Sequence, residues 1–286
     1  MTTGMTEAVF VGAKAVGCAS TGNTAASLAA YAARAGLAAK VYLPAGQVSH
    51  NKLAQALDFG AEVVQVEGSF DLALERLLGA TNHDLYFLNS INPFRLEGQK
   101  TVMFEMLEQL GWQAPDYVVV SGGNLGNTSA FGKALVELQA AGLLDRIPRL
   151  IVVQAEGANP FARMWRSGAS ELVPVEHPET VATAIRIGNP RSWKKALRAV
   201  RFTSGCVMEV TDEEIAEAKA LIGRDGIGCE PASATTLAAL RKLTAQGQID
   251  RDAIVVAILT GHALKDTDFI LKSQRLEQTV AGEVYS

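Results

Sequence analysis

The sequence predicts an α/β protein built on parallel β-sheets, and three observations support this prediction. Short apolar segments typical of strands alternate with longer helix-like segments along almost the whole chain. The strand-like segments are continuous apolar runs, such as Val118–Val120, which is the pattern of strands covered on both faces. Hydrophobic residues make up 48% of the 286 residues, enough for a large core. Alternating strands and helices imply right-handed crossovers between parallel strands.

In the first third of the chain, turn-forming residues set the bounds of the expected elements. Gly36 follows an Ala-rich helix, Pro44 ends a strand, and Ser49 and Gly60 flank the next helix. The strands expected in this part are 15–19, 39–43, 62–66 and 85–88. The expected helices are 24–35, 49–59, 70–78 and 95–110.

The rest of the chain continues the same alternation. Its expected strands are 117–120, 150–153, 207–210 and 254–259, each rich in β-branched residues. Its expected helices are 129–140, 212–222 and 232–246. The stretch 156–201 is the least regular, and its two Asn-Pro pairs, Asn159-Pro160 and Asn189-Pro190, favour turns.

Composition and charge exclude several classes of function. The net charge is −4 and no basic run is longer than a pair, so nucleic acid is not an expected partner. No stretch approaches the ~20 apolar residues of a membrane span, and no signal peptide is recognisable. Cys18, Cys206 and Cys229 form no metal-binding pattern and fit reduced thiols. We therefore expect a cytoplasmic protein without a metal site.

The most informative stretch is the glycine-rich loop Ser121–Thr128, which lies between a strand and a helix. Gly122, Gly123 and Gly126 can expose backbone N–H groups, and the following helix adds partial positive charge at its N-terminus. The side chains that can add donors or cap the helix are Asn124, Asn127 and Thr128. The alternative is an ordinary βα turn, but three glycines and two asparagines exceed what a turn needs. This loop therefore predicts a bound phosphate group.

Ser20–Thr24 is a second polar loop at the end of an expected strand, which is where ligands bind in open α/β sheets. Its hydroxyl and N–H groups suit a carboxylate, and Asn23 can reach a ring hydroxyl or carbonyl. A plain Ser/Thr helix cap would account for the same residues equally well.

Two further loops follow expected strands. Asn89–Arg95 combines short polar side chains with a guanidinium, which binds phosphate or carboxylate through paired donors, although taken alone the segment is better explained by a solvated Asn-Pro turn. In the loop after the last strand, Thr260 can bond a heterocycle nitrogen, whereas His262 fits a structural role. Glu230 opens a helix and can simply complement its dipole. Together, the loops suit a phosphorylated heterocyclic cofactor and a small charged substrate.

At these residues the chain resembles the threonine synthases, within the β-family (fold type II) of pyridoxal-phosphate enzymes. The resemblance covers essentially the whole chain and implies a two-domain fold of parallel sheets like that of the tryptophan synthase β-subunit. The segments that carry it are 20–24, 89–101, 123–127, 182–190, 230–233 and 259–262. Segment 182–190 and the Asn-Ser-x-Asn-Pro-x-Arg stretch are the most specific.

The resemblance implies a role for each matched residue. The residues that would hold pyridoxal 5′-phosphate are Asn23 at the ring oxygen, Thr260 at the ring nitrogen, and Gly123, Asn124, Leu125, Gly126 and Asn127 at the phosphate. The residues that would meet the substrate, O-phosphohomoserine, are Ser20, Thr21, Thr24, Asn89, Ser90 and Arg95. The implied reaction removes the substrate's phosphate and adds water, giving threonine for amino-acid biosynthesis. A homodimer is the expected assembly.

The sequence departs from the family pattern at the lysine that binds the cofactor. Gly4-Met5-Thr6 matches the end of the lysine-bearing segment, so the lysine would fall at Met1, and no lysine precedes Lys14. The strands that the family places upstream are not found either. We therefore expect the N-terminal part of the fold to be missing, no catalytic residue to be assignable, and the chain to be incomplete for catalysis.

We expect residues 1–92 to form a smaller α/β domain and residues 93–286 a larger one that carries the phosphate loop. Two alternatives remain open. An amino-acid dehydratase of the same fold would not need the Asn89–Arg95 loop, because its substrate has no phosphate. A non-catalytic protein that binds the cofactor or another ligand is favoured by Met1 in place of lysine. A nicotinamide-binding domain fits least, since the glycines lack the G-x-G-x-x-G spacing.

Overall fold

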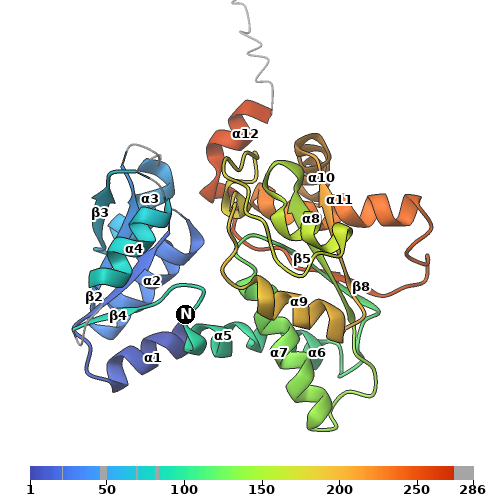
Figure 1. Ribbon diagram of the computed structural model, residues 1–286, viewed down its shortest axis with the longest axis horizontal. Helices are drawn as coiled ribbons and strands as arrows, with labels where there is room; N and C mark the ends of the chain where they lie inside the picture. The colour runs from blue at the N-terminus through green and yellow to red at the C-terminus, as the bar shows by residue number, and fades with distance from the viewer. Residues whose placement is uncertain (21, 46–49, 69, 81–83, 274–286) are drawn as a thin grey trace, which may run out of the picture.

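The computed structural model describes the chain except for residues 21, 46–49, 69, 81–83 and 274–286, and it contains two separate parallel sheets (Figure 1). Each sheet has four strands, in the orders β3-β2-β1-β4 and β7-β6-β5-β8. Every paired neighbour is parallel. The α/β architecture expected from the sequence is therefore confirmed.

The first sheet is built from residues near the N-terminus. Its strands are β1 (Ala15–Ala19), β2 (Ala38–Pro44), β3 (Glu62–Val66) and β4 (Leu85–Phe87). The helices between them are α2 (Asn23–Ala35), α3 (His50–Asp58) and α4 (Phe70–Ala80). Leu28 of α2 packs with Val16 on one face of the sheet, while Leu77 of α4 packs with Ala19 on the other. Both faces are covered, which explains why β1 is apolar, whereas the edge strand β3 also carries Glu62 and Gln65.

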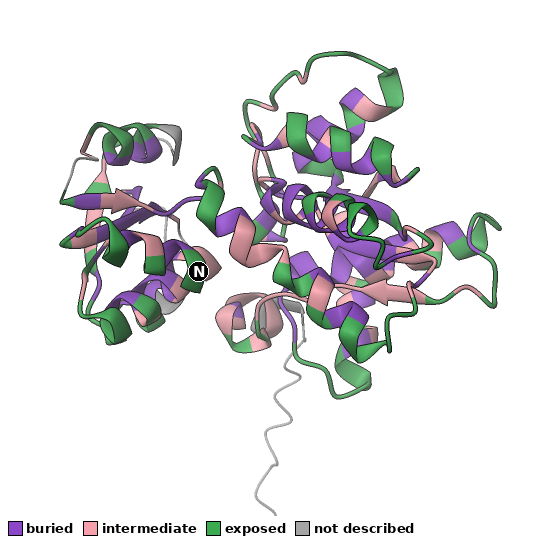
Figure 2. Ribbon diagram, turned by 90° about the horizontal axis from the view of Figure 1, so that it is seen from below, coloured by how far each residue is buried: buried purple, intermediate pink, exposed green. Residues whose placement is uncertain are grey.

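The second sheet forms the larger unit. Its strands are β5 (Tyr117–Ser121), β6 (Arg149–Ala155), β7 (Cys206–Val210) and β8 (Val255–Ala257). The helices that follow β5 are α7 (Gly126–Ala140), α8 (Pro160–Ser167), α9 (Trp193–Phe202), α10 (Asp212–Arg224), α11 (Pro231–Ala245) and α12 (Thr267–Ser273). Val118 and Val120 pack with Phe131 of α7, and Val119 packs on the opposite face with Ala239 of α11. Figure 2 shows buried residues concentrated in the strands and the inward faces of these helices.

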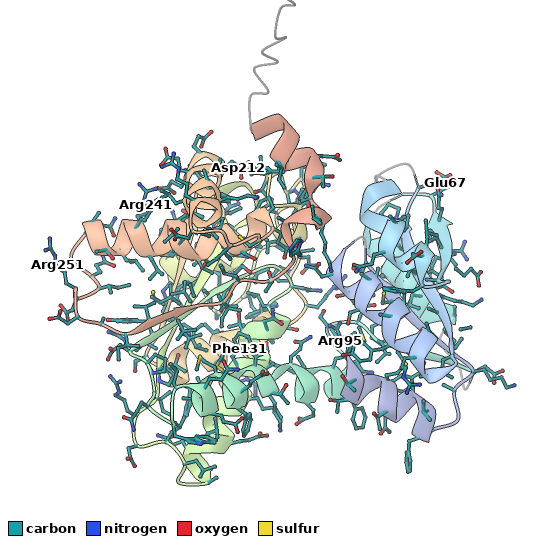
Figure 3. All side chains as sticks on the ribbon, turned by 180° about the vertical axis from the view of Figure 1, so that it is seen from behind. Glu67, Arg95, Phe131, Asp212, Arg241 and Arg251 are labelled. Carbon is teal, nitrogen blue, oxygen red and sulfur yellow. The ribbon has the colours of Figure 1, made fainter. Side chains whose placement is uncertain are left out.

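Helices α1 (Thr2–Phe10) and α5 (Pro93–Gln99) connect the two units, while α6 (Thr101–Gln109) packs in the core of the larger one. Helix α1 contacts both α2 and α5, and α5 contacts α7 of the larger unit (Figures 1 and 3). We infer from this division that residues 1–92 and 93–286 are the two domains. None of the helices in the described ranges is long and apolar enough to cross a membrane.

The helices depart from the sequence prediction in two ways. Segment 95–110 was expected to be one helix, but it is divided at Lys100 into α5 and α6. The Thr101 hydroxyl bonds the carbonyl oxygen of Gly98 at 2.7 Å, and such local bonds compete with the helical ladder. Helices α1, α8, α9 and α12 were not expected at all. Helices α8 and α9 lie within the stretch 156–201, and Pro160 occupies a first-turn position of α8, where proline is tolerated.

The packing of α7 against α9 yields a test of the fold. A Cβ at Gly132 would lie 2.1 Å from the Cβ of Ala199, so we expect Gly132→Ala to lower the free energy of unfolding by about 1–3 kcal/mol through overpacking. Gly223 of α10 is the matched control, because a Cβ there meets nothing within 4 Å. Gly223→Ala should raise stability by about 0.5–1 kcal/mol. Urea unfolding measures both, and equal effects would contradict this packing.

Candidate functional site

The loops that the sequence analysis singled out follow two neighbouring strands in each sheet, one central and one at the edge. In the first sheet β2 and β3 are added on one side of β1, and β4 is then added on its other side. In the second sheet β6 and β7 lie on one side of β5, and β8 lies on the other. Ligands bind outside the carboxyl ends of strands at such switch points. Ser20–Thr24, Asn89–Arg95, Gly122–Asn127 and Thr260–His262 follow β1, β4, β5 and β8 respectively. The topology therefore places all the predicted site segments at switch points.

The glycine-rich loop exposes a row of backbone donors. Within the described part of the chain, the N–H groups from Gly123 to Thr128 donate to no protein acceptor, whereas those of Gly122 and Ser129 do. Leu125 adopts the left-handed conformation (φ 63°), and α7 begins at the next residue. Unpaired N–H groups and a helix N-terminus together form an anion-binding concavity. The Thr128 hydroxyl is fully buried beside them and has no hydrogen-bond partner.

Close packing in this loop favours glycine at positions 122 and 123. A Cβ at Gly122 would lie 2.8 Å from Val152, and one at Gly123 would lie 3.2 Å from Ile185, whereas one at Gly126 would make an ordinary contact of 3.4 Å with the Cβ of Ser90. The loop is thus held between the segment that carries Ile185 and the loop after β4. Glycine serves both tight packing and donor exposure here, so the alternative of an ordinary turn accounts for only part of the arrangement.

Asn124 joins the two units at this loop. Its Nδ2 donates to the Ser90 hydroxyl at 2.8 Å, and its Oδ1 accepts from the Arg191 backbone N–H at 2.7 Å. The Asn124 side chain is therefore engaged in holding the loops together, and the backbone N–H groups are the donors left for a ligand. The Gln99 side chain lies nearby, and its buried Oε1 has no partner.

Asn23 and Thr260 face each other across the units and meet at Glu230. The Asn23 Nδ2 lies 3.0 and 2.9 Å from the two carboxylate oxygens of Glu230. The Thr260 hydroxyl donates to Oε1 of the same carboxylate at 2.7 Å. The Asn23 Oδ1 is buried without a partner, which marks a place for a hydrogen-bond donor.

Arg95 is a buried cation without an anionic neighbour. Its side chain is 9% exposed, Nη1 reaches only the Leu88 carbonyl at 3.5 Å, and Nε has no partner. Burial lowers the pKa of Arg95, and burial also raises the pKa of the nearby Cys18 thiol to about 12, so that this thiol stays neutral. No carboxylate in the described residues forms an ion pair with Arg95. A buried charge of this kind calls for an anion.

Of the remaining residues predicted to bind the substrate, two make hydrogen bonds to the protein backbone. The Asn89 side chain holds the backbone of Ala19, bonding its N–H at 2.8 Å and its carbonyl at 2.9 Å. The Ser20 hydroxyl accepts from the Gly22 N–H at 3.2 Å. Thr24 is half-buried in the first turn of α2. Thr21 lies outside the described residues. Asn89 and Ser20 are thus engaged in shaping the loops.

Sequence reasoning missed Glu230 and Gln99 as site residues, and it gave Thr128 a donor or capping role without placing it among the cofactor-binding residues. An acidic residue before a helix is so common that Glu230 carried no distinct signal. The buried Oε1 of Gln99 and the buried hydroxyl of Thr128 become informative only when their lack of partners is known. Among the described residues, no group of three or more His, Cys, Asp or Glu side chains could hold a metal ion.

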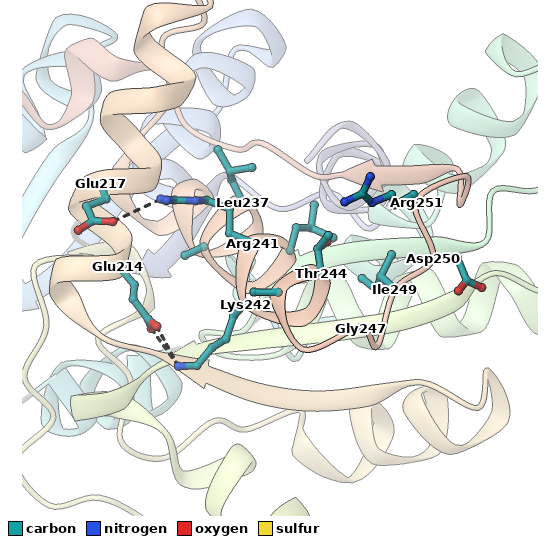
Figure 4. A pocket seen from close by; sticks show the side chains of 13 residues that line it. Glu214, Glu217, Leu237, Arg241, Lys242, Thr244, Gly247, Ile249, Asp250 and Arg251 are labelled. Atoms are coloured by element: carbon teal, nitrogen blue, oxygen red, sulfur yellow. Dashed lines mark hydrogen bonds and ion pairs between the residues drawn. The ribbon is translucent and has the colours of Figure 1, made fainter.

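A larger cavity lies elsewhere, between α10, α11 and the loop at Gly247–Arg251 (Figure 4). Its volume is about 1050 Å³, but most of its charged side chains pair with one another, in Glu217–Arg241 and Glu214–Lys242. None of its lining residues has a buried polar atom without a partner. A cavity of about 370 Å³ lies between the units instead and is lined by Asn23, Glu230 and Lys265. The unpaired groups identify the inter-unit region as the candidate site.

Comparison with known proteins identifies the family of this chain. The family described as "Pyridoxal-phosphate dependent enzyme" matches residues 4–261. A protein named threonine synthase from Methanocaldococcus jannaschii is 51% identical over 275 residues, which are 96% of this chain and 68% of that protein. The threonine synthase of Mycobacterium leprae is 46% identical over 95% of this chain and 74% of its own length.

Solved structures share the fold at lower identity. The processed form of threonine deaminase isoform 2 from Solanum lycopersicum superposes with a TM-score of 0.77 at 20% identity, over 96% of this chain and 78% of that one. The serine racemase of maize gives a TM-score of 0.74 at 20% identity, over 94% of this chain and 80% of that one. These likenesses show the fold alone, whereas the closer sequence relatives show the family. The chain belongs to the pyridoxal-phosphate-dependent enzymes of fold type II and, within them, to the threonine synthase family.

Proposed function

We propose that this protein acts as a threonine synthase, converting O-phospho-L-homoserine and water to L-threonine and phosphate with pyridoxal 5′-phosphate. The observation that carries the proposal is the presence of two anion sites at one place. The unpaired N–H groups from Gly123 to Thr128 form one, and buried Arg95 forms the other. The Asn124–Ser90 hydrogen bond of 2.8 Å joins their loops. A phosphorylated cofactor and a phosphorylated substrate need two such sites.

The residues around the first site fit the cofactor. The N–H row and the unpartnered hydroxyl of Thr128 suit a phosphate group, which needs several donors. Asn23 and Thr260 can bond two edges of a heterocyclic ring. Bound pyridoxal phosphate supplies an electron sink for carbanion chemistry. The protein's own part is to hold the ring and its phosphate in a fixed orientation and to keep water away.

Arg95 and its neighbours suit the substrate's phosphate. The guanidinium offers paired donors that match a phosphate group, and the Ser90 hydroxyl of the same loop lies 2.8 Å from Asn124 Nδ2. Asn89 fixes the end of β1 and so positions the loop Ser20–Thr24, which we propose for the substrate's carboxylate. Release of phosphate next to Arg95 leaves the departing charge compensated.

Two alternatives to a threonine synthase can be weighed against these features. An amino-acid dehydratase acts on an unphosphorylated substrate and gives no reason for a buried, unpaired Arg95. A non-catalytic binding protein fits the same geometry if no amine is placed to act on the substrate. We also propose, on the family resemblance, a homodimer located in the cytoplasm.

The position of the cofactor lysine separates catalysis from binding alone. The resemblance places this lysine at Met1, which lies near Arg95 and beside Gly98. Lys14 forms an exposed ion pair with Asp84 and lies at the opposite end of β1. Among the described residues that line the inter-unit cavity, Lys265 is the one lysine. We therefore propose that residues 1–286 bind the cofactor without a covalent link.

Thr128→Val tests the phosphate cradle. Valine has the shape of threonine but no hydroxyl, and the Thr128 hydroxyl has no protein partner to lose. We expect the free energy of unfolding to be unchanged or higher, and the affinity for pyridoxine 5′-phosphate to fall about tenfold, because a bond to a charged group is lost. Calorimetric titration measures the affinity. Thr203→Val is the control: its buried hydroxyl bonds Leu150 and Ala199, so stability should fall and affinity should not. The reverse pattern would exclude Thr128 from the cradle.

Arg95→Gln tests the substrate's phosphate site. Removing the charge should weaken binding of O-phospho-L-homoserine by about 30-fold or more, since loss of a buried charged partner costs about 2–5 kcal/mol. Affinity for pyridoxine 5′-phosphate should change little. Arg163→Gln, on the exposed side of α8, is the control. Equal binding of O-phospho-L-homoserine by the Arg95 variant and the wild type would remove Arg95 from the site.

Met1→Lys, made behind an added initiator methionine, tests whether the proposed lysine position supports turnover. We expect phosphate and threonine release to rise at least about a hundredfold over the unsubstituted chain, the range that a positioned acid–base group contributes. Met1→Arg keeps the charge without a group for proton transfer, so it should stay inactive. Robust turnover by the unsubstituted chain would contradict this assignment, and borohydride reduction with peptide mass analysis would then show whether Lys265 holds the cofactor. No turnover in any of these proteins would favour the non-catalytic alternative.

A further inference from the structure

Glu230 is a buried carboxylate that connects the two units. Its side chain is 6% exposed and accepts hydrogen bonds from Asn23 of the first unit and Thr260 of the second. Within the described chain no Lys, Arg or His forms an ion pair with Glu230. The cations of the same helix, Lys242 and Arg241, pair instead with Glu214 and Glu217 respectively. Hydrogen bonds to an ionised group are roughly twice as strong as neutral ones. The hydrogen bonds from Asn23 and Thr260 therefore offset the cost of burying the Glu230 carboxylate.

The backbone around Glu230 is fixed, so only its side chain is free to change position. Its N–H donates to the Gly261 carbonyl at 2.9 Å, and Pro231 locks the next residue in the first turn of α11. A Cβ at Gly261 would lie 2.3 Å from the carboxylate carbon of Glu230. Glycine at this position is what allows the carboxylate to reach the space between Asn23 and Thr260.

That space is too narrow for a ring as it stands. The Asn23 Nδ2 and the Thr260 hydroxyl lie 3.0 and 2.7 Å from the same oxygen, Oε1, so their separation cannot exceed the sum of these distances. Two hydrogen bonds of about 2.8 Å, one from each group, already add up to this separation. A ring that is bonded at two of its edges also needs space for its own width between the two groups. The carboxylate therefore occupies the place that the proposed function gives to the cofactor ring.

A second position for the carboxylate lies next to it. Glu230, His262 and Lys265 line the cavity of about 370 Å³ between the units. In the described structure Lys265 is half-buried and its side chain makes no hydrogen bond or ion pair. A carboxylate that leaves Asn23 and Thr260 can thus exchange two hydrogen bonds for an ion pair with Lys265.

We propose that Glu230 is an internal competitor for the cofactor ring. In one arrangement its carboxylate binds Asn23 and Thr260 and draws the two units together. In the other it turns toward Lys265 and releases both side chains for the ring of a pyridoxal-type ligand. This inference rests on the proposed function for the roles of Asn23 and Thr260. The ring binds only the second arrangement, so its apparent affinity is lowered by the fraction of molecules in the first.

Calorimetric titration of the full chain with two probes tests the competition. Pyridoxine 5′-phosphate carries the ring and the phosphate but no aldehyde, and inorganic phosphate occupies the cradle alone. Glu230→Gln should bind pyridoxine 5′-phosphate about tenfold more tightly than the wild type, because a neutral amide holds Asn23 and Thr260 less strongly. Lys265→Gln should bind it several-fold more weakly. In the double variant Glu230→Gln/Lys265→Gln, the effect of Lys265 should disappear, as expected for coupled residues. Affinity for inorganic phosphate should stay constant throughout.

Several results would overturn the proposal. Unchanged or weaker binding of pyridoxine 5′-phosphate by Glu230→Gln would mean that Glu230 assists the ring. Tighter binding of both probes would mean a general effect on the fold. Glu217→Gln, an exposed residue of α10, is the control and should leave both affinities unchanged.

Hydrogen exchange of the ligand-free chain separates this proposal from the proposed function. Exchange at the first turn of α2, where Asn23 lies, should be faster in Glu230→Gln than in the wild type because the units separate more often. Faster exchange without any binding of pyridoxine 5′-phosphate would contradict the proposed function and, with it, the competition. Unchanged exchange together with normal ligand binding would contradict only the competition.

Discussion

Parallel strands impose the constraint on which this structure depends. Because neighbouring strands run in the same direction, all their carboxyl ends lie at one edge of a sheet, and the loops that follow them gather there. The protein contains two sheets of this kind. The switch point lies between β1 and β4 in the first sheet and between β5 and β8 in the second. The region between the units is therefore bordered by loops from distant parts of the sequence, of which Asn23 and Glu230 are an example.

The polar groups left unpaired at this edge define its chemistry. Buried backbone and side-chain groups are nearly always hydrogen-bonded, so each exception needs an explanation. Here the exceptions gather in one region: the N–H groups of the loop before α7, the Thr128 hydroxyl, Arg95 and the Asn23 Oδ1. The cavity beside α11 has more volume, but most of its charged side chains are already paired. Unsatisfied groups locate the site better than cavity size does.

Much of this arrangement could be predicted from the sequence, and the exceptions have physical reasons. Continuous apolar runs such as Val118–Val120 identify strands because both faces of each sheet are covered. Glycines and short polar residues after the strands indicate the loops. Helices α8 and α9 escaped prediction because turn signals at Asn159-Pro160 and Asn189-Pro190 dominate their surroundings. Partners that come from the other unit leave no local pattern, which is why the role of Glu230 beside Asn23 is visible only in three dimensions.

The central claim is that a single region between the two sheets binds both the phosphorylated cofactor and the phosphorylated substrate. Amide nitrogen–proton chemical shifts of the isotopically labelled chain, recorded during titration with pyridoxine 5′-phosphate and then O-phospho-L-homoserine, test it directly. The first ligand should shift the amides of Gly123, Gly126 and Thr128 most, and the second should add shifts around Ser90 and Arg95. Shifts concentrated at the cavity between α10 and α11, with none in the glycine-rich loop, would contradict the account.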